Sequence, residues 1–153
     1  MDLPVDVYSP DQLSELLLQL QDVAGVVRGA AARKNADAEP VTLSPELEQL
    51  LSINKITVDD ANALDDLGKQ IQATLDQAPA VHVMLAAMPG RAIRRQLTAW
   101  FRTQVNPLTL ITFAARSDLG GGAIVQAGSH LYDLSFRRSI IDNKKRLTEI
   151  AGV

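Results

Sequence analysis

The spacing of apolar residues changes at Pro79, and this change constrains the fold more than any other feature of the chain. Before Pro79, apolar residues recur every three or four positions, as in amphipathic helices. After it, Val81, Val83 and Leu85 alternate with other side chains, as in a half-buried strand. The sequence therefore predicts an α+β fold, with an acidic helical region at residues 1–79 and a small domain of α/β-like order at residues 80–153.

Three helices are expected before Pro79. Ser9-Pro10 and Ser44-Pro45 each combine an N-cap residue with proline at the first helical position. These pairs predict a long helix that ends near residue 34 and, after a polar loop, a shorter one. Thr57 is expected to cap the third helix. The apolar stripe of that helix would consist of Leu64, Leu67, Ile71 and Leu75.

The second region is expected to follow a β-α-β-β-β-α order. Strands at residues 81–85 and 108–114 flank a helix, and such a crossover joins parallel strands. A glycine turn then separates short strands at residues 123–127 and 130–132. A terminal amphipathic helix follows. The expected buried face of the crossover helix consists of Ile93, Leu97, Trp100, Phe101 and Val105.

Composition limits the classes of function. The chain has 153 residues, 46% of them hydrophobic, which suffices to bury a core. It has no cysteine, which excludes disulfides and thiolate chemistry. No apolar run approaches the roughly 20 residues that span a bilayer, and the first eight residues lack the features of a signal peptide. We therefore expect a folded protein whose contact with a membrane is indirect.

The two regions carry opposite charge. Residues 1–79 contain 14 Asp and Glu against five Lys and Arg, a net charge of −9. Residues 80–153 contain four against ten, a net charge of +6. Such asymmetry suits nucleic acid, an anionic membrane surface or a charged protein partner, and charge alone does not choose among them.

The run Gly120-Gly121-Gly122 invites a phosphate-binding interpretation, because consecutive backbone N–H groups without side chains can cradle an anion. The residues that follow do not fit. A P-loop needs Lys and then Ser or Thr opening a helix, whereas the next residues are strand-like, and a dinucleotide fingerprint needs glycine where Val125 stands. The glycines are expected instead to allow a bulge or a close backbone approach, so no cofactor-binding residue is predicted, and a nucleotide-dependent enzyme is disfavoured.

His130, Asp133 and Ser135 are the residue types of a hydrolase triad. On a strand, however, His130 and Asp133 point to opposite faces, and no nucleophile elbow surrounds Ser135. Capping of the terminal helix by Asp133 or Ser135 is the favoured interpretation. No catalytic residue is predicted.

No metal site is predicted either. His82 and His130 are the only histidines, too few for a histidine site, and His82 is expected on the outer face of its strand. The acidic residues around the third helix do not follow the spacing of an EF-hand loop, so a solvated face explains them better. These residues are Asp59, Asp60, Asp65 and Asp66.

The segment from residue 118 to residue 135 carries a family resemblance. Asp118-Leu119-Gly120-Gly121 precedes an Ile124-Val125 strand, a turn at Gly128, and Tyr132-Asp133-Leu134-Ser135 before an arginine-rich helix. This order resembles the delta subunit of F-type ATP synthase, whose mitochondrial counterpart is the oligomycin-sensitivity-conferring protein. The resemblance covers residues 80–150. The family begins with a six-helix bundle, of which a shortened form is expected here. The motif residues are Gly120, Gly121, Gly128, Asp133 and Ser135.

The resemblance implies a non-catalytic stator subunit that needs no cofactor, metal or small-molecule ligand. In the family, this subunit ties the catalytic head to the peripheral stalk, so that rotation is coupled to ATP synthesis and proton transport. The implied partners are subunit b and the alpha subunits. The implied location is the cytoplasmic side of the cell membrane, reached through the complex. Arg137, Arg138 and Ile141 of the terminal helix are expected at a partner interface.

A basic nucleic-acid-binding module is the alternative. Arginines of the second region would contact phosphates, and Trp100 and Phe101 would stack on bases. The position of both aromatic residues on an apolar stripe favours core packing, and the acidic first region opposes nucleic acid. The arginines in question are Arg91, Arg94, Arg95, Arg102, Arg137 and Arg138.

Overall fold

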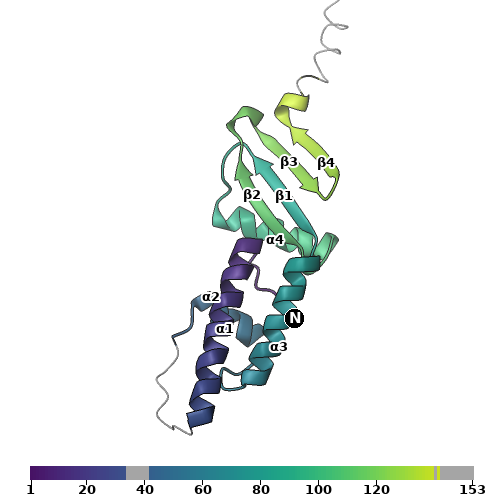
Figure 1. The fold of residues 1–153 in the computed structure, drawn as a ribbon. Coiled ribbons are helices and arrows are strands. Elements are labelled where there is room, and N and C mark those ends of the chain that lie inside the picture. The colour runs from purple at the N-terminus through teal and green to yellow at the C-terminus, as the bar shows by residue number, and fades with distance from the viewer. Residues whose placement is uncertain (34–41, 140, 142–153) are drawn as a thin grey trace, which may run out of the picture.

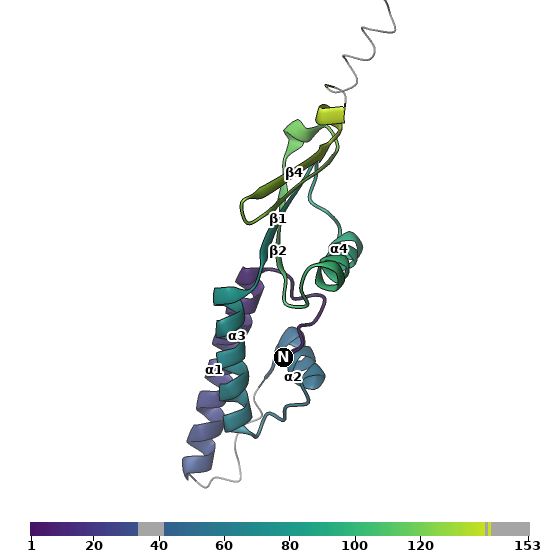
Figure 2. The same cartoon turned by 90° about the vertical axis from the view of Figure 1, so that its right-hand side faces the viewer.

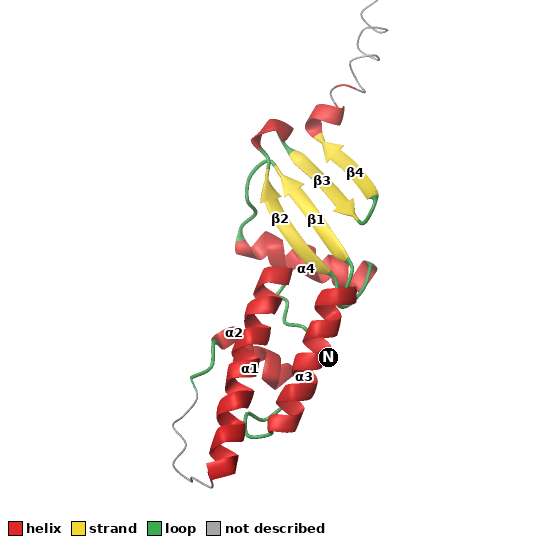
Figure 3. Cartoon of the chain, viewed as in Figure 1, coloured by secondary structure: helices red, strands yellow, loops and turns green. Residues whose placement is uncertain are grey.

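The computed structural model describes residues 1–33, 42–139 and 141. The first three helices gather at one end of the molecule, and a four-stranded sheet with a further helix against it occupies the other, so the predicted α+β fold is confirmed (Figures 1 and 3). The elements in chain order are α1 (Pro10–Arg33), α2 (Pro45–Ile53), α3 (Ala61–Gln77), β1 (Ala80–Leu85), α4 (Arg91–Gln104), β2 (Leu110–Ala115), the 3-10 turn η1 (Ser117–Leu119), β3 (Gly122–Ala127) and β4 (His130–Ser135).

The helical region is built on α1 and α3, which lie side by side and antiparallel, with α2 packed against them (Figures 1 and 2). The first two predicted helices are confirmed. The Oγ atom of Ser44 accepts a hydrogen bond from the backbone N–H of Leu47 at 3.3 Å, as an N-cap does. The core of this region includes Leu13, Leu16, Leu20, Leu47, Leu50, Leu64, Leu67 and Ile71.

The third helix begins later than predicted. Asp60, not Thr57, is its N-cap, because the Asp60 carboxylate accepts hydrogen bonds from the N–H groups of Asn62 and Ala63, both at 3.1 Å. Thr57 lies one turn earlier, where its carbonyl accepts from the Asp60 N–H. Two cap-forming residue types stood within one turn, and the sequence did not distinguish between them.

The sheet has the order β2-β1-β3-β4. Strand β1 is parallel to β2, in the register Val81 to Ile111, and antiparallel to β3, in the register Val83 to Val125. The predicted crossover through α4 and the predicted hairpin are therefore confirmed. Helix α4 lies against one face of the sheet (Figure 2), where Phe101 joins the buried core of the strands.

The predicted buried face of α4 was wrong in part. Thr98 and Phe101 are buried, whereas Ile93, Trp100 and Val105 are more than half exposed. The helix is rotated because the side chains of Arg94 and Arg102 point inward, where they bind the first eight residues of the chain. Core packing therefore explains Phe101 but not Trp100.

The end of the chain lies largely outside the described residues. A helical turn at residues 136–139 follows β4, and residue 141 is also helical. Most of the predicted terminal amphipathic helix falls on residues that the structure does not describe.

The position of the third helix cap gives a direct test. We expect Asp60→Ala to lower the free energy of unfolding by about 1 kcal/mol, because two backbone N–H groups lose their acceptor. Thr57→Ala is the matched control and should change it by less than about 0.5 kcal/mol, as is usual for exposed positions. Urea unfolding followed by circular dichroism measures both. Equal losses for the two variants would contradict the assignment of Asp60 as the cap.

Candidate partner interface

Three consecutive glycines open the β3–β4 hairpin with backbone angles that other residues rarely adopt. Their φ values are 62°, 138° and 79° for Gly120, Gly121 and Gly122. A Cβ atom on Gly122 would overlap the carbonyl oxygen of Leu134, and one on Gly121 would overlap the ring of Phe136. The predicted close backbone approach is therefore confirmed, and the glycines bring β3 against the end of β4.

The other end of the hairpin is a two-residue turn at Gly128-Ser129. Ala127 pairs with His130 across it, and Gly128 has a φ of 57°, which glycine adopts without strain. The strand that follows is longer than predicted and continues to Ser135.

Asp133 and Ser135 fix the exit from β4. The Asp133 carboxylate accepts a hydrogen bond from the N–H of Ser135 at 3.0 Å, and the buried Ser135 hydroxyl accepts one from the N–H of Arg138 at 3.3 Å. Ser135 thus caps the following helical turn, as predicted. Hydrogen bonds from Ser135 hold the pKa of Asp133 below its usual value, and the charges of Arg138 and Arg137 act in the same direction.

An apolar surface surrounds this exit. The large side chains of β4 and of the turn after it are more than half exposed, beside the exposed Arg137 and Arg138. The sheet register places Tyr132 and Leu134 on the same face as Val83, the face that α4 covers farther along at β1 and β2. We call this the exit surface; its residues are Tyr132, Leu134, Phe136 and Ile141, whereas Leu131 is exposed on the opposite face of β4.

The sequence prediction found only part of the exit surface. Ile141 was expected at a partner interface and is exposed, as are Arg137 and Arg138 beside it, but Tyr132, Leu134 and Phe136 were missed. Apolar side chains at consecutive positions of a strand normally indicate burial on both faces, so the sequence carried no signal of their exposure.

The residue types of a triad are not arranged as one. His130 lies beside Tyr132, with ring centroids 6.5 Å apart, on the opposite face of β4 from Asp133. Asp133 and Ser135 bind backbone N–H groups at the helix start. Among the described residues, no group of three or more His, Cys, Asp or Glu could hold a metal ion.

Most arginines considered for phosphate binding are engaged within the chain. Arg91 and Arg95 form ion pairs with Asp6, with nitrogen–oxygen distances of 3.2 and 3.7 Å. Arg94 donates to the hydroxyl of Tyr8 at 2.6 Å, and Arg102 is bound to backbone carbonyls. A nucleic acid would have to displace these contacts.

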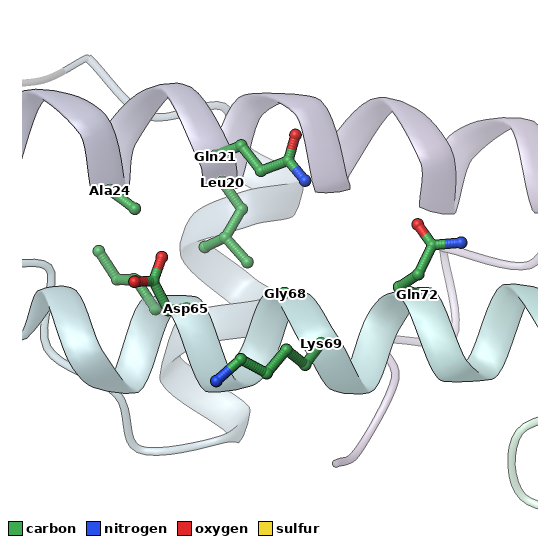
Figure 4. Close-up of a pocket in the computed structure, with 8 residues that line it drawn as sticks. Leu20, Gln21, Ala24, Asp65, Gly68, Lys69 and Gln72 are labelled. Atoms are coloured by element: carbon green, nitrogen blue, oxygen red, sulfur yellow. The ribbon is translucent and has the colours of Figure 1, made fainter.

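A separate open groove of about 340 Å³ lies between α1 and α3 (Figure 4). Gly68 lines this groove, and a Cβ atom there would meet Leu17 and Leu20 only at ordinary contact distances of 3.7 and 3.8 Å. Around it stand polar side chains, among them Asp65, which forms an ion pair with Arg28 at 3.1 Å. The residues that line the groove form no catalytic or metal-binding group.

Comparison of the sequence with models of known protein families and with curated proteins gave no match. No helix among the described residues has the length and apolar content needed to cross a membrane.

The glycine at the start of β3 should be intolerant of any side chain. We expect Gly122→Ala to lower the free energy of unfolding by about 3 kcal/mol, because a positive φ and a clash with the Leu134 carbonyl act together. Gly25→Ala is the matched control: Gly25 lies inside α1 with open space around it, so alanine should stabilise by about 1 kcal/mol. Urea titration of both variants checks the pair. A neutral Gly122→Ala would show that the close approach is dispensable.

Proposed function

We propose that this chain is a non-catalytic stator subunit of an F-type ATP synthase, linking the catalytic head to subunit b of the peripheral stalk. The observation that carries the proposal is the glycine-opened hairpin: a positive-φ glycine run, a Gly128 turn, and Asp133 and Ser135 at the start of a helical turn. The sequence motif that resembles the delta subunit thus coincides with a defined structural unit.

The order of the second region supports the same proposal. A parallel β-α-β crossover followed by an antiparallel hairpin is the order that the resemblance implies. Catalysis is not part of the proposed role, which requires only that the subunit bind two partners at once.

Subunit b is the proposed partner of the exit surface. Exposed Leu134, Phe136 and Ile141 offer the apolar centre that a stable interface needs, and Arg137 and Arg138 offer a charged rim. The rim would favour an acidic partner segment and set its orientation.

The alpha subunits are the proposed partners of the helical region, whose surface carries most of the acidic residues of the chain. On this proposal, the two regions hold different partners at opposite ends of the molecule, since the sheet and the helices occupy opposite ends (Figure 1). The subunit would reach the cytoplasmic side of the cell membrane through the complex.

Co-purification tests the proposal. A tagged chain expressed with the alpha and b subunits of its own genome should recover both. Ile141→Asp combined with Arg137→Glu should lower the recovery of b by about tenfold or more, because an interface residue in the apolar centre is worth over 1 kcal/mol. Leu18→Asp, an exposed apolar residue of α1, is the control and should leave the recovery of b unchanged. Recovery of neither subunit by the unaltered chain would refute the stator role.

Nucleic-acid binding predicts a different result. With four arginines engaged internally, we expect no micromolar binding of duplex or single-stranded DNA at low salt, where phosphate contacts are strongest. Fluorescence anisotropy with labelled oligonucleotides at 20 mM salt, a low-salt condition, measures this. Tight binding that weakens steeply with added salt would favour the alternative function.

A further inference from the structure

Residues 3–8, which we call the strap, run between the helical region and α4 before entering α1 (Figure 2). Several side chains of α4 make polar contacts with this segment. The guanidinium of Arg102 donates to the carbonyl oxygens of Leu3, Pro4 and Val7, at 3.1, 2.8 and 2.6 Å. One side chain of α4 thus holds three carbonyl groups of a segment nearly a hundred residues away in the sequence.

The guanidinium of Arg102 loses solvent where it binds the strap, and no carboxylate among the described residues compensates for this loss. Burial lowers the pKa of Arg102 to about 10, so the group is still charged at neutral pH, and its contacts in the strap are carbonyls and not a carboxylate. The buried Nε atoms of Arg94 and Arg102 have no hydrogen-bond partner within the described part of the chain. A partly buried charge without a carboxylate partner is stabilised mainly by these three carbonyl groups.

Other arginines of α4 also bind residues of the strap. Asp6 binds Arg91 and Arg95, and the ring of Tyr8 lies under the guanidinium of Arg94, 5.5 Å from its centroid. The carbonyl of Tyr8 accepts a hydrogen bond from the N–H of Ile111 in β2. The strap therefore binds both α4 and the outer edge of the sheet.

The strap itself belongs to the helical region. It continues directly into α1, and its buried Val7 is part of the helical core. Just before it, the backbone of Asp2 exchanges two hydrogen bonds with Asn54, both at 2.9 Å. A separate core of Val81, Val83, Phe101 and Ile111 serves the sheet, and Leu110 joins the core of the helices.

We propose that the strap fixes the orientation of the sheet region relative to the helical region, and that each region keeps its own core when the hold of α4 on the strap is broken. The regions would then reorient about the short connection at Pro79, between α3 and β1, with Leu110 leaving the helical core and the Tyr8–Ile111 hydrogen bond breaking. This inference stands on the contacts of the strap and is independent of the proposed stator role.

Distance measurement between spin labels tests the inference on the full chain. The sequence has no cysteine, so Gln72→Cys in α3 and Ser129→Cys in the hairpin turn, both exposed, give one labelled pair. The variant is Arg102→Met, which keeps an unbranched side chain and removes the guanidinium. Arg116→Met is the matched control, because Arg116 binds Asp118 within the sheet region.

Pulsed electron spin resonance should give one narrow distance distribution for the unaltered chain and for Arg116→Met. Arg102→Met should lose that narrow peak and keep its far-ultraviolet circular dichroism. A narrow peak in folded Arg102→Met would overturn the proposal. If Arg102→Met unfolds completely, the double variant Asp6→Asn with Tyr8→Phe is measured instead. A narrow peak in that double variant would also overturn the proposal, because the strap would then be part of one cooperative core.

Discussion

Strand β1 forms hydrogen bonds along both of its edges, and the rest of the sheet is placed by it. On one side it is parallel to β2, so the chain must cross over between them, and α4 is that crossover. On the other side it is antiparallel to β3, which allows the tight hairpin to β4. Because β1 follows α3 after two residues, Ala78 and Pro79, the same strand also ties the sheet to the helices.

Much of this arrangement was predictable, because it depends on local spacing. The alternation of Val81, Val83 and Leu85 gave β1, and the pairs Ser9-Pro10 and Ser44-Pro45 gave two helix starts to within a residue. The face of α4 was not predictable in the same way. Trp100 is apolar but exposed, because Arg94 and Arg102 turn inward to residues that lie far away in the sequence. The periodicity of apolar residues describes one helix by itself, so it could not predict the contacts between α4 and the strap.

In the candidate interface, too, the local features were predicted and the features that depend on distant contacts were missed. Gly121 and Gly122 were expected to permit a close approach, since that expectation depends only on their lack of a Cβ atom. The groups that approach them, in Leu134 and Phe136, follow from the register of the hairpin. The exposure of Tyr132 and Leu134 was missed because it depends on how far α4 extends across the sheet. An apolar residue in a strand is normally expected to be buried, and here the cover ends before β4.

Asp133 has a consequence beyond the capping of a turn. It places a charge in the middle of an edge strand that is otherwise rich in apolar side chains, and its carboxylate occupies the N–H of Ser135. At the opposite edge, the carbonyl of Tyr8 occupies the N–H of Ile111. One N–H group at each border of the sheet is thus unavailable to an added strand, and strand addition is the step by which exposed sheets polymerise into fibres. The apolar exit surface therefore lies on a sheet whose edges are partly protected against such growth.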